Sequence, residues 1–164
     1  MKKIPLVKIG ALVCAVVLAA GVLAGCGNAA MNAASSEQQA NRAYMSQVNE
    51  IMDELNKQLD SFVDAVSRGD VVNMRTQAEN AYKALDKLDA LEVPDALKDI
   101  QEKYKEGTSK LREALNAYIA LYTEMSGNSF DMSTYDKRIA DVQKLYDDGV
   151  KLMEEGDKAA ADKS

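Results

Sequence analysis

Apolar side chains recur at spacings of three and four residues in four separate runs that follow residue 36. This period places the apolar positions of each run on one face of an α-helix. No comparable run alternates with a period of two, so the pattern predicts helices and no strands. The runs are Tyr44, Val48, Ile51, Leu55, Leu59, Phe62, Val66; Met74, Ala78, Ala81, Leu85, Leu88; Leu97, Ile100, Tyr104, Gly107, Leu111, Ala114, Tyr118, Leu121, Met125; and Tyr135, Ile139, Val142, Tyr146, Gly149, Met153.

Local signals separate the four predicted helices. Gly69 suits the residue after a helix end, and Asp70 can cap the next helix. Pro94 suits the first turn of the third helix. Ser133 is expected to open the fourth helix and Gly156 to close it. The predicted helices are near 37–68, 70–91, 95–126 and 133–156, and 157–164 is expected to be a polar C-terminal tail.

Short connections make consecutive helices antiparallel. The leading prediction is therefore an all-α domain over residues 37–156, an antiparallel up-down-up-down four-helix bundle. About 120 residues suffice to bury one core without a metal or a disulfide. The alternative is an elongated pair of helical hairpins that packs fully only in a homodimer.

One spacing occurs twice. The positions of Leu59 and Phe62 in the first helix are matched by Leu115 and Tyr118 in the third, each pair inside the long helix of a predicted long-short hairpin. Either the domain arose by internal duplication, or two amphipathic helices share a common pattern.

A different pattern comes before the helices. Two lysines follow Met1, an apolar run covers residues 9–22, and small residues then precede Cys26. This order is typical of a processed leader and not of a structural helix. It resembles the lipobox of bacterial lipoproteins. The resemblance implies a signal peptide over 1–25, recognised by the signal peptidase through Leu23, Ala24 and Gly25, and a lipid on Cys26.

The resemblance also implies a location. A lipid on Cys26 would hold the protein at the outer, extracytoplasmic face of the cell membrane. Residues 26–36 are then the lipidated cysteine and a flexible tether, at most about 33 Å long. The alternatives are an ordinary signal peptide or an uncleaved anchor, for which residues 9–25 are short.

The helical body is similar to small lipoproteins of uncharacterised function in Gram-positive bacteria. The likeness lies in the junction at residues 91–95 and the tyrosine-bearing helix after it. It implies no activity.

The charge balance disfavours nucleic acid as a partner. The chain has 20 basic and 26 acidic residues, a formal net charge of −6, and no long basic stripe. The charged residues among residues 1–25 are all basic, so removal of this segment would make the remaining chain more acidic.

Most catalytic chemistry lacks its usual residues. The chain has no histidine, which is the usual general base and the commonest transition-metal ligand. Cys26 would be the only cysteine left after cleavage. Acids such as Asp86 and Asp89 fall on predicted solvated faces. We therefore expect no enzyme, no cofactor and no metal site.

Two glycines stand in register inside the third and fourth helices, where glycine costs about 1 kcal/mol relative to alanine. Folding the two helices about their loop brings Gly107 and Gly149 close together, with Ala78 and Leu59 at nearly the same level. Either the helices approach closely there, or the layer is a pocket for a small ligand. The candidate pocket residues are Phe62, Ala78, Tyr104, Gly107, Tyr146 and Gly149, with Thr108 and Ser109 adding hydroxyls nearby.

Seven of the nine aromatic residues are tyrosines. Their rings can pack at the edge of the core with the hydroxyls reaching water. Alternatively, several hydroxyls point into a shared cavity.

Two functions fit these features. The first is a membrane-anchored, non-catalytic helical interaction module for an envelope partner, which predicts a solid core and an exposed apolar or tyrosine-bearing patch. The second is a small-ligand binder or sensor, which predicts an internal pocket.

Overall fold

A computed structural model describes residues 36–127 and 130–163, and these ranges are helical with no strand. The all-α prediction is confirmed. The predicted leader, its recognition residues, Cys26 and the tether up to residue 35 lie outside the described residues. The long helices are α1 (Ser36–Ser67), α2 (Val71–Asp89), α3 (Lys98–Met125) and α4 (Tyr135–Ala161), with short 3₁₀ helices η2 (Asp95–Leu97) and η3 (Met132–Thr134) before the last two.

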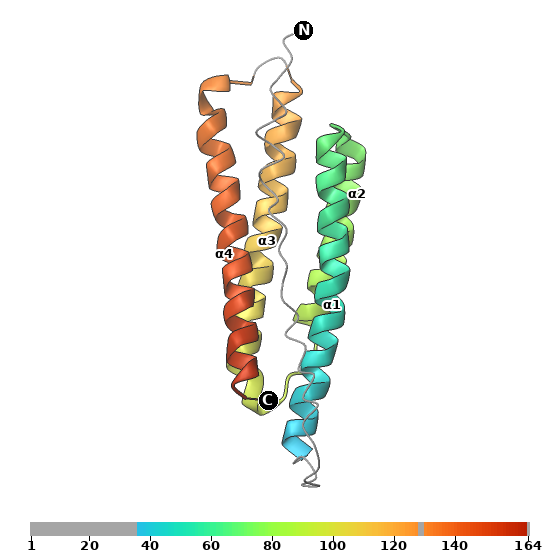
Figure 1. Cartoon of the computed structure of the whole chain (residues 1–164). Coiled ribbons are helices and arrows are strands. Elements are labelled where there is room, and N and C mark those ends of the chain that lie inside the picture. The colour runs from blue at the N-terminus through green and yellow to red at the C-terminus, as the bar shows by residue number, and fades with distance from the viewer. Residues whose placement is uncertain (1–35, 128–129, 164) are drawn as a thin grey trace.

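The long helices run alternately up and down and form two hairpins (Figure 1). Contacts between α3 and α4 show this direction, because Glu124 near the end of α3 pairs with Arg138, whereas Lys103 near its start pairs with Glu155. Helix α1 packs mainly on α2, and α4 mainly on α3. The hairpins meet chiefly through α2 and α3, whereas the α1 and α4 backbones come close at few positions. The α1–α4 side is therefore the most widely spaced side of the bundle, and we call it the open side.

The buried side chains follow the apolar runs, except at Met125, which ends the third run, and at three positions of the fourth. Every position of the first two runs is buried. In the fourth run, Tyr135, Ile139 and Tyr146 are only half-buried. These residues belong to α4, which α1 does not cover. Their partial exposure therefore follows from the wide spacing of α1 and α4.

The link between α1 and α2 has the predicted caps. Gly69 has φ +67°, in the left-handed region that glycine adopts without strain. The Gly69 and Asp70 amides donate to the Val66 and Ala65 carbonyls at 3.0 Å, a Schellman motif. Asp70 then accepts from the Asn73 amide at 3.1 Å and caps α2.

The predicted end of the fourth helix is wrong. Helix α4 continues through Gly156 to Ala161, and its 27 residues nearly equal the 28 of α3. The second hairpin is therefore not a long-short pair. Gly156 is needed for a close contact and not for a stop, because a Cβ there would lie 2.9 Å from Cε1 of the Tyr104 ring.

The residues assigned to a polar tail also take part in the fold. Ala160 is 1% exposed. Lys163 pairs with Asp99 at 2.8 Å, and its backbone carbonyl accepts from the Asn41 amide at 3.3 Å. The end of the chain therefore joins the start of α1 to the start of α3.

The start of α4 is also later than predicted. Asp131 accepts from the Ser133 amide at 2.9 Å and caps η3. This short helix occupies the positions expected for the first turn of α4, which begins at Tyr135.

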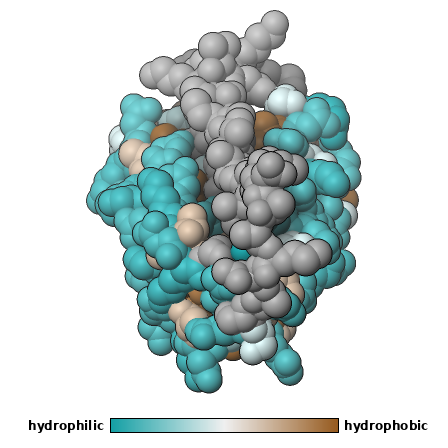
Figure 2. All heavy atoms as spheres, turned by 60° about the horizontal axis from the view of Figure 1, so that its bottom comes forward, coloured by the Kyte–Doolittle hydropathy of each residue, from teal (hydrophilic) through white to brown (hydrophobic). Residues whose placement is uncertain are grey.

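The outer surface is polar. The face in Figure 2 is mostly hydrophilic where the described residues are drawn, with hydrophobic residues visible in small patches. The exposed large hydrophobic residues of the described ranges are Val72 and Met132, 75% and 55% exposed. Among the described helices, none combines the length and the apolar character needed to cross a membrane.

Candidate functional site

The glycine layer between α3 and α4 is a close helix contact. A Cβ on Gly107 would lie 3.0 Å from the Gly149 carbonyl oxygen and 2.9 Å from Cγ of Met153. A Cβ on Gly149 would lie 3.0 Å from the Gly107 carbonyl oxygen and 3.1 Å from Cγ of Leu111. The space that a ligand would need is therefore filled by backbone. Of the two alternatives expected for this layer, the structure has the close approach and not the pocket.

Three other residues of that prediction also lie elsewhere. The Tyr104 ring covers Gly156, and its hydroxyl donates to Asp157 Oδ1 at 2.6 Å. Ala78 lines a shallow groove between α2 and α3. Thr108 Oγ1 lies 2.9 Å from Asp89 Oδ1, so its hydroxyl faces α2.

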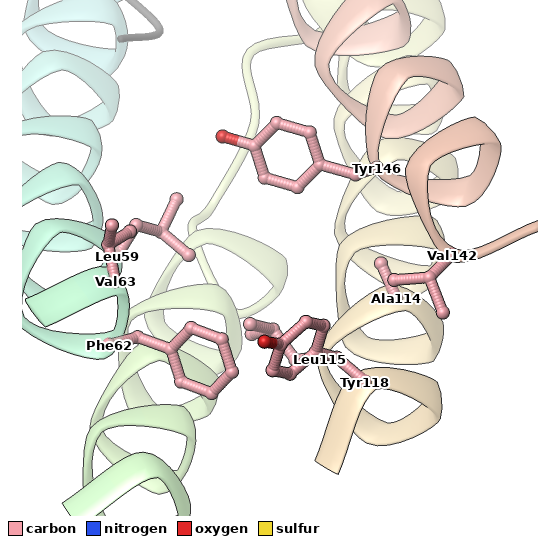
Figure 3. Close-up of a pocket in the computed structure, with 8 residues that line it drawn as sticks. All are labelled: Leu59, Phe62, Val63, Ala114, Leu115, Tyr118, Val142 and Tyr146. Atoms are coloured by element: carbon pink, nitrogen blue, oxygen red, sulfur yellow. The ribbon is translucent and has the colours of Figure 1, made fainter. Parts of the chain in front are cut away.

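The remaining two predicted residues, Phe62 and Tyr146, line a different hollow. It lies on the open side of the bundle, among side chains of α1, α3 and α4 (Figure 3). It is partly open to solvent, and its volume is about 30 Å³, room for a water or two. We call it the α1–α4 cleft. Its lining residues are Leu59, Phe62, Val63, Ala114, Leu115, Tyr118, Val142 and Tyr146.

Two tyrosine side chains line this cleft, whose exposed surface is almost wholly apolar. Tyr118 and Tyr146 both point their hydroxyls from the α3–α4 hairpin toward α1 (Figure 3). The Tyr118 ring meets the Phe62 ring edge-on, with centroids 5.7 Å apart and an interplanar angle of 74°. Tyr118 is 4% exposed, and its buried hydroxyl has no hydrogen-bond partner among the described residues. An unpaired buried hydroxyl is uncommon and needs a reason.

Burial sets the protonation state of both hydroxyls. It is the main cause that raises the pKa of Tyr118 well above its usual range, and it raises the pKa of Tyr146 to about 12. Both phenols therefore stay neutral at physiological pH, and each can donate one hydrogen bond.

The sequence contained a signal for this cleft. The repeated spacing pairs Leu59 with Leu115 and Phe62 with Tyr118. All four residues line the cleft, and the two rings touch. The glycine layer pointed to a level about two turns away from Ala114 along α3. The predicted pocket residues did not include Val63, Leu115 and Val142. Nothing in the local sequence shows which side of the bundle stays open.

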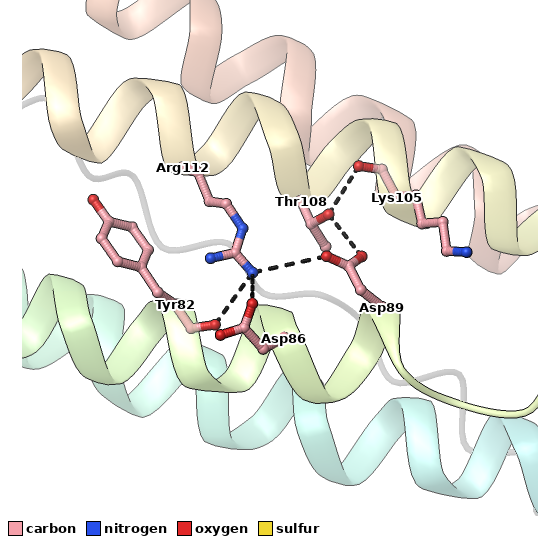
Figure 4. Close-up of polar contacts among 6 residues, drawn as sticks. All are labelled: Tyr82, Asp86, Asp89, Lys105, Thr108 and Arg112. Atoms are coloured by element: carbon pink, nitrogen blue, oxygen red, sulfur yellow. Dashed lines mark hydrogen bonds and ion pairs between the residues drawn. The ribbon is translucent and has the colours of Figure 1, made fainter.

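The side opposite the cleft is tied by polar contacts between α2 and α3 (Figure 4). Arg112 Nη2 lies 2.6 Å from Asp86 Oδ1 and 3.7 Å from Asp89 Oδ2, and it donates to the Tyr82 carbonyl at 3.3 Å. The Arg112 guanidinium also lies 5.6 Å from the centre of the Tyr82 ring. Asp86 and Asp89 of the first hairpin thus pair with Arg112 of the second. The sequence pattern predicted them only as solvated surface charges.

A second polar cluster lies near the end of α4, around Asp157. Burial, the largest cause, raises the pKa of Asp157, and the hydrogen bond from Tyr104 partly opposes this rise. Tyr44 is also buried, and burial raises its pKa to about 12. The Tyr44 hydroxyl and Asn41 Oδ1 have no hydrogen-bond partner among the described residues.

Neither a search for metal sites nor a comparison with known proteins assigns a function to the chain. Within residues 36–127 and 130–163, no group of three or more acidic, histidine or cysteine side chains could hold a metal ion. Comparison of the chain with protein families, with curated proteins and with solved structures found no match.

Proposed function

We propose that this chain is a bacterial lipoprotein, anchored through a lipid on Cys26 at the extracytoplasmic face of the cell membrane. Its helical body acts there as a non-catalytic binding module for an envelope partner, and the α1–α4 cleft is the binding surface. The lipobox-like residues before Cys26 support the anchor. The short span from Cys26 to Ser36, at which α1 begins, would keep the body near the membrane.

The observation that carries the binding role is the uneven joining of the two hairpins. Polar contacts link α2 to α3, whereas the α1 and α4 backbones come close at few positions and leave an apolar hollow between them. A partner's apolar side chains can enter such a hollow and remove its lining from water. The cleft thus provides the apolar patch that an interaction module needs, recessed between two helices.

The anchor is tested by two cysteine variants of the full chain, expressed in bacteria fed an alkyne-bearing fatty acid. The Cys26→Ser variant should lose all label and keep its leader, which shows as a larger mass. The Cys14→Ser variant should label and mature as the wild type does. Label retained on Cys26→Ser would contradict the lipoprotein assignment.

The binding surface is tested by photo-crosslinking in cells from two exposed positions. Asp60 lies at the cleft rim, where its charge acts on Tyr146, and Lys83 lies on α2. A probe at Asp60 should give one dominant crosslinked product, and a probe at Lys83 should not. Equal yields from both positions would exclude the cleft as the binding surface.

A small-ligand binder at the same cleft is the second candidate. The unfilled apolar space among Leu59, Tyr118 and Tyr146 favours it, because an apolar group of a ligand can occupy such a hollow.

A further inference from the structure

The start of α1 is covered by different parts of the chain from the rest of the helix. Helix α1 has 32 residues and α2 has 19, and residues 68–70 set the two side by side from the end of α1. About the first 13 residues of α1 therefore extend past the end of α2 (Figure 1). We call residues 36–48 the α1 extension. Asn41 and Tyr44 in this extension are buried, although α2 does not reach them.

The second hairpin and the chain end cover the α1 extension. The side-chain amide of Asn41 donates to the Lys163 carbonyl at 3.3 Å. Burial and the bonded Asp157 are the larger causes that raise the pKa of Tyr104, and the nearby Tyr44 hydroxyl adds to them. Tyr44 therefore lies close to Tyr104 of α3. The α1 extension is thus docked near the start of α3 and the end of α4.

Lys163 holds this docked arrangement together. Its ammonium group donates to the Ala96 carbonyl at 2.8 Å and to the two carboxylate oxygens of Asp99 at 2.8 and 2.9 Å. These bonds fix the chain end on the start of α3, and the Lys163 carbonyl is then in place to accept from α1. Ala160, one turn earlier, is 1% exposed. We call residues 160–163 the C-terminal clasp.

Docking of the α1 extension has unfavourable as well as favourable contributions. Oδ1 of Asn41 and the hydroxyl of Tyr44 are buried without a hydrogen-bond partner among the described residues. Water would reach both atoms if the extension moved away, so both atoms favour release. The burial of the Tyr44 ring and of Val48 favours docking. Because these contributions oppose each other, a few polar bonds from Lys163 can decide between the two states.

We propose that the α1 extension is a strap, held by the C-terminal clasp, that opens while the rest of the bundle stays folded. Opening exposes apolar surface of Tyr44, Val48 and Tyr104, which are at most 2% exposed in the docked state. The chain before Ser36 joins the strap directly, so a pull on that segment acts on the strap before it acts on the core. The strap lies outside the α1–α4 cleft and goes beyond the proposed function.

Amide hydrogen exchange of the full chain in detergent, read by mass spectrometry, tests the strap. Amides of residues 42–48 should exchange together, about tenfold faster than those of residues 81–88 in α2. Their exchange should change little in urea below the unfolding transition, because a local opening exposes little surface. Exchange of residues 42–48 only through global unfolding, with the urea dependence of α2, would overturn the proposal. A gradual rise in protection along the extension would show fraying of the helix end and would also overturn it.

Two lysine variants compare the clasp with a matched ion pair. Lys163→Ala removes the bonds to Asp99 and should speed the exchange of residues 42–48 about threefold. Lys98→Ala removes an exposed ion pair with Asp95 at the same end of the bundle, but this pair lies within one stretch of chain. It should leave the exchange of residues 42–48 unchanged. Equal effects of the two variants, or faster exchange in every helix of Lys163→Ala, would overturn the role of the clasp.

Tyr44→Phe tests the contribution that favours opening. It removes a buried hydroxyl without a partner and keeps the ring, so it should slow the exchange of residues 42–48 about fivefold. Tyr82→Phe makes the same change at a tyrosine of α2 whose hydroxyl donates to Asn116, and it should not alter the exchange of this segment. Unchanged or faster exchange in Tyr44→Phe would overturn the proposal. None of these variants changes the lining of the α1–α4 cleft, so the strap can fail while the proposed function stands, and the reverse.

Discussion

Helix α4 meets its two neighbours in opposite ways. Against α3 it comes close enough that a single added Cβ at Gly107 or Gly149 would lie about 3.0 Å from a carbonyl oxygen of the other helix. Against α1 it leaves a hollow between Val142, Tyr146 and Leu59. Small residues at the same level on both helices remove space, whereas branched and aromatic residues on both sides hold the helices apart.

The two regions also differ in whether a buried tyrosine hydroxyl has a hydrogen-bond partner. Tyr104 and Tyr118 lie on one face of α3, about four turns apart. The Tyr104 hydroxyl has an acceptor in Asp157, whereas the Tyr118 hydroxyl has none among the described residues. Nearly equal burial therefore leads to a satisfied pair in one region and an unsatisfied donor in the other.

The largest expected effect is overpacking of the glycine contact. Gly107→Val should lower the free energy of unfolding by about 3 kcal/mol, because its side chain meets the Gly149 carbonyl and Met153. Ala140→Val, at an exposed position of α4, is the control for β-branching in a helix and should change stability by about 0.5 kcal/mol. Urea unfolding measures both. Similar values for the two variants would mean that the contact is loose.

Removing the hydroxyl of Tyr104 should have the next largest effect. Tyr104→Phe should lower the free energy of unfolding by about 2 kcal/mol, since it leaves the half-buried Asp157 carboxyl without its donor. Thermal or urea unfolding measures the change. A neutral result would place Asp157 in contact with water.

The same substitution at Tyr118 should act in the opposite direction. Without ligand, Tyr118→Phe should raise the free energy of unfolding by about 1 kcal/mol, because it removes a buried donor that has no partner. The comparison of Tyr104→Phe and Tyr118→Phe in one unfolding series sharpens the contrast. If Tyr118→Phe destabilises as Tyr104→Phe does, both hydroxyls are structural.

The smallest expected effect is a dependence on pH carried by Asp157. Its folded pKa is raised, so the folded state binds more protons than the unfolded state between the ordinary carboxyl pKa and the raised one. The contribution of Asp157 to stability therefore falls as pH rises through that window. Asp157→Asn does not titrate, so its stability relative to wild type should rise across the window and then level off.

The difference between the two proteins isolates this one group. Partners of Asp99, Glu124 and Glu155 lower the pKa of these carboxyls, so their contributions are lost as pH falls. These contributions are common to wild type and Asp157→Asn, and they cancel in the difference. A flat difference would show that Asp157 is not desolvated.

Much of the fold could be predicted from local patterns. The three-four spacing located all four long helices, and Gly69 and Asp70 marked one boundary for reasons of backbone geometry and capping. The same reasoning failed at Gly156 and Ser133. A glycine looks alike in sequence whether it ends a helix or admits the Tyr104 ring, and the Asp131 cap moved the start of α4.

The sequence by itself determined which residues form helices and which face of each helix is apolar, because both depend on side chains a few positions apart. Only the tertiary structure decided which helices touch. An apolar face with period 3.6 is compatible with any neighbour, so the pattern alone could not show that α3 and α4 close on their glycines while α1 and α4 stay apart. The α1–α4 cleft is lined by Phe62, Tyr118 and Tyr146, side chains from three helices that no local pattern could bring together.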